Sequence, residues 1–157
     1  MSRILPIIIN PNPILRKKSV LVKDIKSGQL KQFCSDLAKT MIEKDGVGLA
    51  APQVSKNIHI IAVNTKDGPI CLINLKITKK SLTKEWGEEG CLSVPGVFGQ
   101  VKRHKKINCI YCDQAGKEKK IEAQGLMARV IQHEIDHLDG ILFIDKARNI
   151  KQENSNN

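Results

Sequence analysis

The chain has 157 residues, is 41% hydrophobic and carries a formal net charge of +10. A chain of this size and apolar content fits one compact domain with a single core, and no run approaches the ~20 apolar residues that a membrane-spanning helix needs. Its five cysteines, an odd number, argue against a disulfide framework and suit a reducing cytoplasm.

One amphipathic helix is predicted in the first third of the chain. Prolines make residues 1–23 irregular, and apolar residues at positions 30, 33, 37 and 41 then recur at helical spacing over residues 27–44. Asp45 and Gly46 are expected to end this helix. The segment 46–53, which follows at once and contains two glycines, is expected to be a loop.

Strands are predicted over most of the middle of the chain. Runs typical of strands cover residues 58–64, 70–78, 101–112 and 118–123. Because these strands precede one further helix, at 124–138, the sequence predicts a single α+β domain. In that domain, mixed or antiparallel strands would pack around the helix as a central, metal-binding element.

A glycine-rich segment between these strands contains one of the cysteines. Residues 87–96 read GEEGCLSVPG, so that Cys91 is bracketed by glycines and followed by Pro-Gly. This pattern is typical of a shaped loop with close backbone approach, and it differs from core filling.

The other four cysteines are predicted to be structural. Cys34 and Cys71 lie among apolar residues and fit small core side chains. Cys109 and Cys112 form a C-x-x-C, which can indicate a metal or redox pair. Because odd spacing on a strand directs two side chains to opposite faces, a structural role is favoured for this pair.

The helix predicted over residues 124–138 contains the motif H-E-I-D-H at 133–137. Two histidines four residues apart project from one helix face, so both imidazoles can reach one metal ion, and Glu134 can reach a water on that ion. Glu134 also falls within the apolar stripe of the helix, where a carboxylate is costly unless a cation compensates it. The alternative is a polar helix face that spells the motif by chance.

A hydrolytic metal site usually has three protein ligands and one open position. Phe143 stands where a longer form of the motif places a third histidine, and Glu153 lies downstream in a polar tail. The third ligand is therefore expected upstream, and Cys91 is the candidate, which gives a Cys-His-His site. Asp136 faces away from the two histidines by helical geometry and is expected to stabilise the helix or to support a ligand.

Three segments together resemble the peptide deformylase family. They are residues 46–53 (GVGLAAPQ), 89–93 (EGCLS) and 132–137 (QHEIDH), which stand in the family's order and rough spacing. The resemblance implies a divalent metal ion, and its ligands would be Cys91, His133 and His137.

The resemblance also implies roles for residues around the metal. Glu134 would handle protons, and the Gln53 side chain and the Leu92 backbone N–H would bind the developing oxyanion. The substrate peptide would be held as an added strand by backbone groups of Val47, Gly48 and Gly90.

The implied reaction is removal of the formyl group from the initiator N-formylmethionine of new polypeptides, with release of formate. A metal ion lowers the pKa of its bound water from ~15.7 to ~7, and this water would attack the formyl carbon with Glu134 as general base and then general acid. The family metal is usually Fe²⁺, and Zn²⁺, Ni²⁺ or Co²⁺ can replace it. A thiolate ligand suits iron or zinc and disfavours magnesium or calcium.

Two other functions could use the same residues. A zinc endopeptidase also carries H-E-x-x-H, but its downstream ligand is absent from this sequence. A metal-bound binding protein without activity would be favoured by loss of Glu134, Gln53 or a metal ligand, and none is lost.

The net charge of +10 suits an acidic partner. One interpretation is the ribosome surface near the exit of the nascent chain, and the other, slightly favoured, is general solubilisation by lysine. One Trp, one Tyr and three Phe offer no base-stacking platform, so sequence-specific nucleic-acid binding is not expected.

The catalytic domain is expected over residues 1–150, followed by a polar, disordered tail over 151–157. Only twelve residues follow Asp145, which argues against the C-terminal helix with which some family members dock on the ribosome. The N-terminal segment lacks the features of a signal peptide. A bacterial-type cytoplasmic location is therefore expected, or an organelle if an upstream targeting segment was removed.

Overall fold

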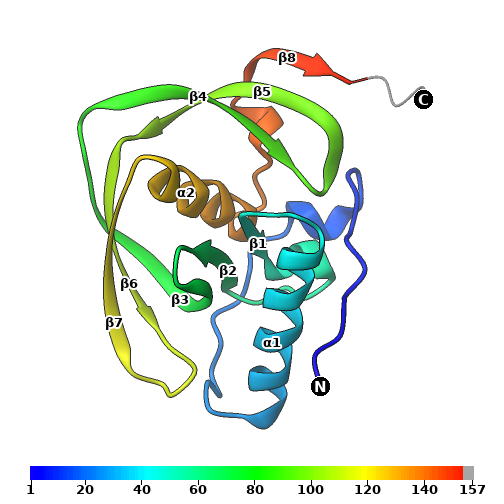
Figure 1. The fold of residues 1–157 in the computed structure, drawn as a ribbon, viewed down its shortest axis with the longest axis vertical. Helices are drawn as coiled ribbons and strands as arrows, with labels where there is room; N and C mark the ends of the chain where they lie inside the picture. The colour runs from blue at the N-terminus through cyan, green and yellow to red at the C-terminus, as the bar shows by residue number, and fades with distance from the viewer. Residues whose placement is uncertain (154–157) are drawn as a thin grey trace.

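Two helices and two antiparallel sheets form the computed structural model, which describes residues 1–153 (Figure 1). The larger sheet has five strands in the order β1-β2-β3-β6-β7, and the smaller sheet has three in the order β4-β5-β8. The helices are α1 (Gly28–Glu43) and α2 (Leu126–Leu138). The strands are β1 (Gly48–Ala50), β2 (Ile60–Thr65), β3 (Gly68–Lys80), β4 (Lys84–Cys91), β5 (Val94–His104), β6 (Lys106–Cys112), β7 (Glu118–Gln124) and β8 (Arg148–Gln152).

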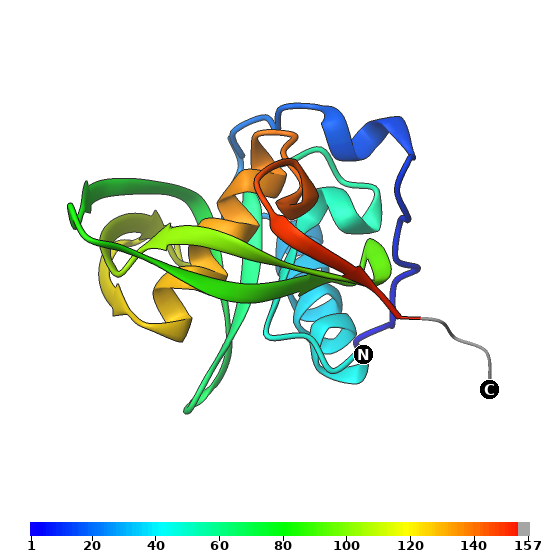
Figure 2. The ribbon, with the colours of Figure 1, turned by 90° about the horizontal axis from the view of Figure 1, so that it is seen from above.

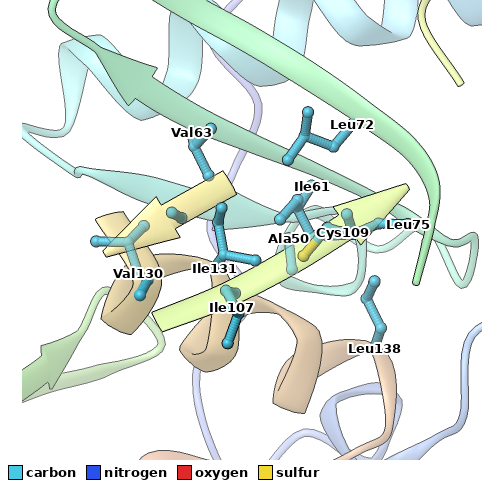
Figure 3. Close-up of a cluster of buried hydrophobic side chains, with 12 residues drawn as sticks. Ala50, Ile61, Val63, Leu72, Leu75, Ile107, Cys109, Val130, Ile131 and Leu138 are labelled. Carbon is cyan, nitrogen blue, oxygen red and sulfur yellow. The ribbon is translucent and has the colours of Figure 1, made fainter. Parts of the chain in front are cut away.

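Helix α2 lies between the two sheets (Figures 1 and 2). Its apolar side chains Val130, Ile131 and Leu138 face residues of the five-stranded sheet in one buried cluster (Figure 3). Three short 3-10 segments complete the fold, at Pro13–Arg16, Ala51–Val54 and Phe143–Asp145. In the described part of the chain, no helix has the length and apolarity to cross a bilayer.

Strand β2 explains why the larger sheet carries a helix on each face. Ile61 and Val63 belong to the core cluster shared with α2, whereas Ile60 and Ala62 belong to the cluster shared with α1. Because successive side chains of a strand point to opposite faces, a run of four apolar residues requires cover on both sides. The two helices supply that cover, and the domain is a single α+β unit.

The structure confirms the bounds predicted for the first helix, α1. Ser27 caps it by accepting a hydrogen bond from the Leu30 N–H at 3.1 Å, and Lys44 ends it. Asp45 follows in a left-handed conformation with φ of 56°. The buried positions are those of the predicted stripe, including Leu30, Leu37 and Met41.

Asp36 on α1 holds the N-terminal segment. Its carboxylate accepts hydrogen bonds from the Arg3 N–H at 2.8 Å and the Gln32 amide at 2.9 Å. Burial raises the pKa of Asp36, but these hydrogen bonds outweigh it and lower the pKa below the usual 3.8. The stabilisation is therefore present above about pH 3.8 and is lost as the pH falls through the lower folded value.

The substitution Asp36→Asn is expected to destabilise the protein by about 1–2 kcal/mol at pH 7 and by less near pH 3, which lies below the usual pKa of 3.8. Urea unfolding midpoints at the two pH values would measure the difference. The matched control is Asp24→Asn, at an exposed position, whose effect should be small at both. An equal loss at both pH values in Asp36→Asn would mean that its charge does not contribute.

The glycine-rich segment over 87–96 was predicted to be a loop, but it forms the turn end of a β-hairpin. Strands β4 and β5 pair from Lys84 opposite His104 to Gly90 opposite Phe98, and only the turn after Cys91 is short and irregular. Glycine is uncommon in strands, yet here a Cβ on Gly90 would lie 2.8 Å from the Phe98 ring. The glycine therefore marks close packing within a strand, not a chain reversal.

Three further predictions of secondary structure need correction. The single strand expected over 101–112 is two strands, β5 and β6, which are separated at Lys105. The loop expected over 46–53 contains β1 and a 3-10 turn. Part of the expected tail, through Gln152, forms β8 on the edge of β5, so the domain extends beyond 150. Residues 154–157 of that tail lie outside the described residues.

The prediction for the C-x-x-C pair is confirmed. Cys109 lies in the core cluster beneath α2, whereas Cys112 packs against the cluster beneath α1. The two thiols therefore occupy opposite faces of β6. Burial raises the pKa of Cys109 to about 11, so its thiol stays neutral and acts as a small core side chain.

Gly140 ends α2 in a conformation that favours glycine. Its φ is +74°, and a Cβ there would overlap the backbone carbonyl of Arg16. Substitution of Gly140 by Ala is expected to cost about 1–3 kcal/mol, measured as a shift in the urea midpoint. Gly28→Ala, at an open position at the start of α1, is the matched control and should not destabilise. A neutral Gly140→Ala would show that the Arg16 segment moves freely.

Candidate metal centre and active site

Cys91, His133 and His137 meet in space although 46 residues separate the first from the last. Cys91 ends β4, and the two histidines lie one turn apart on α2 with ring centroids 5.0 Å apart. One potential ligand atom from each lies within 4.8 Å of the other two, and Cys91 Sγ is 3.3 Å from His137 Nε2. The predicted trio is thus assembled around one point.

The hydrogen bonds of His133 fit a metal ligand. Its Nδ1 is 2.8 Å from Glu89 Oε1, which orients the ring and leaves Nε2 facing the other two side chains. A carboxylate on the far nitrogen is the usual support for a ligating histidine. Phe143, at the position where a longer zincin motif has a histidine, stacks on the His133 ring at 6.0 Å instead of offering a ligand.

The electrostatics of the trio also fit a cation. Burial alone lowers the pKa of His133, but the Glu134 carboxylate and hydrogen bonds with Cys91 and Glu89 raise it to about 10. Burial lowers the pKa of His137 well below its usual value, and the charge of His133 adds to this. The anionic groups that favour a proton on His133 equally favour a divalent cation among a thiolate and two imidazoles.

Glu134 lies beside the trio and is only 4% exposed. Its Oε2 is 4.0 Å from His133 Nε2, and its Oε1 has no hydrogen-bond partner among the described residues. Burial raises its pKa to about 7. Gly48 makes room for it, because a Cβ there would lie 2.7 Å from Glu134 Oε2. A carboxyl with such a pKa can both accept and return a proton near neutral pH.

Gln53 is held with its amide N–H groups directed toward Cys91. Its Oε1 accepts a hydrogen bond from the Ala50 N–H at 2.9 Å. Its Nε2 donates to Ser93 Oγ at 3.1 Å and lies 3.5 Å from Cys91 Sγ. These contacts fix the amide orientation next to the candidate metal site, with Leu92 in the adjoining turn.

Sequence reasoning missed the buried ion pairs behind the trio. Arg103 donates to both oxygens of Glu89 at 2.9 Å and to Asp136 at 2.6 Å, and Arg129 also donates to Glu89 at 2.7 Å. Although burial raises the pKa of Glu89, the hydrogen bonds from Arg103 and His133 lower it to about 2. Glu89 stands in the EGCLS segment, but nothing in the spacing indicates its partners. Asp136 supports the site through Arg103, consistent with its predicted direction away from the metal pair.

A pocket of ≈ 490 Å³ opens onto the trio. All nine predicted site residues except His137 line it: Val47, Gly48, Gln53, Gly90, Cys91, Leu92, His133 and Glu134. Strands β1 and β4, which are edge strands of different sheets, both reach this pocket. An extended peptide between them would find unpaired backbone groups on either side.

Comparisons with known proteins agree with this geometry. The polypeptide deformylase family profile matches residues 4–153. A peptide deformylase from Thermoanaerobacter pseudethanolicus is 47% identical over 134 residues, which cover 85% of this chain and 83% of that protein. A second, from Syntrophomonas wolfei, is 47% identical over 141 residues, covering 90% and 91%.

Solved structures show the same fold. The peptide deformylase of Thermotoga maritima superimposes with a TM-score of 0.90 at 37% identity, covering 94% of this chain and 99% of that one. That of Synechococcus elongatus, solved in complex with actinonin, gives 0.88 at 39% identity, covering 92% and 79%. The chain therefore belongs to the peptide deformylase family, the metal-dependent hydrolases that remove the N-formyl group from newly made polypeptides.

Proposed function

We propose that this pocket carries out the family reaction with one divalent metal ion, held by Cys91 of strand β4 and by His133 and His137 of helix α2. The observation that carries the proposal is the meeting of these three ligand atoms within 4.8 Å of one another beside the buried carboxylate of Glu134. Three ligands with an open side match a catalytic metal site. When bound, the ion would polarise the formyl oxygen and lower the pKa of a water molecule.

The substrate is proposed to lie as an extra strand between the two sheets. Backbone groups of Val47 and Gly48 on one side and Gly90 on the other would pair with it. Gly48 on β1 and Gly90 on β4 support this arrangement, since both stand on edge strands that border the pocket. The formyl group would then point toward Cys91 and Glu134.

Glu134 is proposed to move the proton during hydrolysis. It accepts a proton from the attacking water as the new C–O bond forms at the formyl carbon, and it later gives this proton to the amine nitrogen as the C–N bond breaks. Formate and a peptide with a free amino group leave. The pKa of about 7 that burial gives Glu134 suits both transfers.

Gln53 and Leu92 are proposed to stabilise the developing negative charge on the formyl oxygen. The Gln53 amide is already oriented by Ala50 and Ser93, so little reorganisation is needed when the charge develops. One such preorganised donor can contribute ~3 kcal/mol to catalysis.

We propose Fe²⁺ as the metal in the cell, with Zn²⁺, Ni²⁺ or Co²⁺ able to replace it. The support is the mixed ligand set of one soft thiolate and two imidazoles. Metal analysis of protein purified without oxygen would test this directly. About one iron per chain is expected, and zinc in its place under those conditions would overturn the iron proposal.

Formate release from an N-formylmethionyl tripeptide tests the function itself. Anaerobic protein loaded with Fe²⁺ or Ni²⁺ should release formate, and a chelator should abolish the release. A zinc endopeptidase would instead cleave internal bonds of an unformylated peptide. A fully metal-loaded protein with neither activity would support the non-enzymatic alternative.

We propose nascent N-formylmethionyl chains in a bacterial-type cytoplasm as the substrate pool, with the ribosome surface near the exit tunnel as an electrostatic partner. Exposed lysines support the second part: Lys76 and Lys120 lie on opposite sides of Ile110 across three strands, and Lys79 follows on β3. Co-sedimentation with ribosomes at low and high salt tests it. If the protein does not bind ribosomes at low salt, the exposed lysines serve only to keep it in solution.

A further inference from the structure

The face of α2 that lines the pocket continues beyond the metal site. Leu126, Arg129, Val130 and His133 recur at helical spacing, and all four line the pocket. The step from His133 back to Arg129 is about 6 Å along the helix axis. If the proposed function holds, the formyl group lies at His133, and the first side chain of the substrate extends along this face toward Arg129 and Val130.

Arg129 is held rigidly at that end of the pocket. Its side chain is 11% exposed. Its guanidinium donates to Glu89 Oε2 at 2.7 Å, to the Val101 carbonyl at 2.8 Å and to the Glu85 carbonyl at 2.9 Å. These acceptors belong to β4 and β5, so the side chain bridges α2 to the smaller sheet. Its carboxylate partner, Glu89, is shared with Arg103.

Gly87 provides the space that the guanidinium occupies. A Cβ on Gly87 would lie 2.7 Å from Arg129 Cζ and 2.8 Å from its Nε. Arg129 lines the pocket, whereas Gly87 does not, so the glycine lies behind the guanidinium as seen from the pocket. The backbone of Gly87 does not have a positive φ, and the three heavy atoms nearest to an added Cβ all belong to Arg129.

We propose that Arg129, seated against Gly87, is the specificity-determining residue that limits the length of the first side chain accepted by the pocket. A longer side chain would meet a guanidinium that can retreat neither toward Gly87 nor away from its three acceptors. The limit thus comes from a fixed polar group and not from the apolar wall of Val130.

The experiment compares N-formyl tripeptides that differ only in the first residue. Norleucine has nearly the length of methionine, and 2-aminooctanoic acid is two carbons longer. The ratio of kcat/KM for the shorter over the longer peptide is expected to be at least about tenfold in the unmodified metal-loaded enzyme, and Arg129→Ala should lower it by about tenfold. The control is Arg148→Ala, at an exposed arginine that stacks on Trp86 at 3.5 Å, and it should leave the ratio unchanged.

Gly87→Ala should act in the opposite direction. The added Cβ pushes the guanidinium away from β4 and into the pocket, so the ratio should rise. In an Arg129→Ala background the same change has no guanidinium to displace, and its effect should nearly vanish, which makes the pair strongly non-additive. Gly87→Ala by itself also tests the proposal if Arg129→Ala folds poorly.

Two results would overturn the proposal. One is an equal fall in kcat/KM for both peptides in Arg129→Ala, which would indicate that Arg129 acts only through Glu89 and the His133 ring. The other is an additive Gly87 and Arg129 pair. Metal content measured in each variant would separate these cases from loss of the metal. Failure of the unmodified enzyme to deformylate any peptide would overturn the proposed function instead.

Discussion

Replacement of Glu134 by glutamine is expected to lower kcat for deformylation by about 10²–10⁴-fold while the protein keeps one metal ion per chain. Glutamine has the shape of glutamate, but its amide cannot accept the proton of an attacking water. The proposed ligand atoms belong to Cys91, His133 and His137, so metal binding is not expected to depend on Glu134. The residue is also buried without a partner for Oε1 among the described residues, so the substitution breaks no known hydrogen bond at that atom.

Formate release and metal content, measured on the same preparations, test this prediction. Glu122→Gln is the matched control, since it makes the same change at an exposed position on β7 and should leave turnover unchanged. Full turnover in Glu134→Gln would show that another group moves the proton. Loss of metal together with activity would show that Glu134 is needed to hold the ion.

Replacement of Arg103 by methionine is expected to destabilise the protein by about 3–5 kcal/mol. Arg103 is 4% exposed and lies between the carboxylates of Glu89 and Asp136, which are themselves 7% and 8% exposed. Without the guanidinium, two buried carboxylates lose their principal cation. Methionine has a similar length and replaces much of the packing, so the loss reports mainly on charge and hydrogen bonds.

Urea unfolding in the presence of a chelator would measure this loss, because bound metal would otherwise stabilise the folded state by an unequal amount in each variant. Lys102→Met, at the exposed neighbour on β5, is the control and should change stability by no more than about 0.5 kcal/mol. Lys146 Nζ also lies 3.0 Å from Asp136 Oδ2. A loss below about 1 kcal/mol in Arg103→Met would mean that Arg129 beside Glu89 and Lys146 beside Asp136 suffice to balance the two carboxylates.

The same substitution should also weaken metal binding. Glu89 holds the His133 ring through Nδ1, and Arg103 holds Glu89 with two hydrogen bonds. Loss of a group that supports a ligand typically lowers metal affinity by about 10–100-fold. Competition with a metal-binding dye would give the affinity.

Periodic features of the chain could be predicted from the sequence because they depend on neighbours along it. The spacing of apolar residues placed α1 within one residue of its observed bounds at each end, and the spacing of four residues placed the two histidines on one face of α2. Alternation along β6 separated Cys109 from Cys112. The H-E-x-x-H motif carries its chemistry within one helical turn, so its meaning did not need the rest of the fold.

Glycines misled the prediction where their role depended on a distant partner. The segment 87–96 was expected to be a loop, yet Gly87 makes room for Arg129 and Gly90 for Phe98 within a hairpin. The sequence of the segment does not indicate whether a glycine allows a turn or leaves room for a neighbouring side chain. Only the side chain that fills the space decides this.

The sequence by itself therefore determined the helices, the candidate metal ligands and the family resemblance. The tertiary structure alone decided what surrounds them: the hairpin that brings Cys91 to α2, the Glu89–Arg103–Asp136 ion pairs, and the seat of Arg129 against Gly87. The physical reason is range. Helical periodicity repeats every few residues, whereas strand pairing and buried ion pairs join segments that are far apart along the chain and leave no spacing from which they could be read.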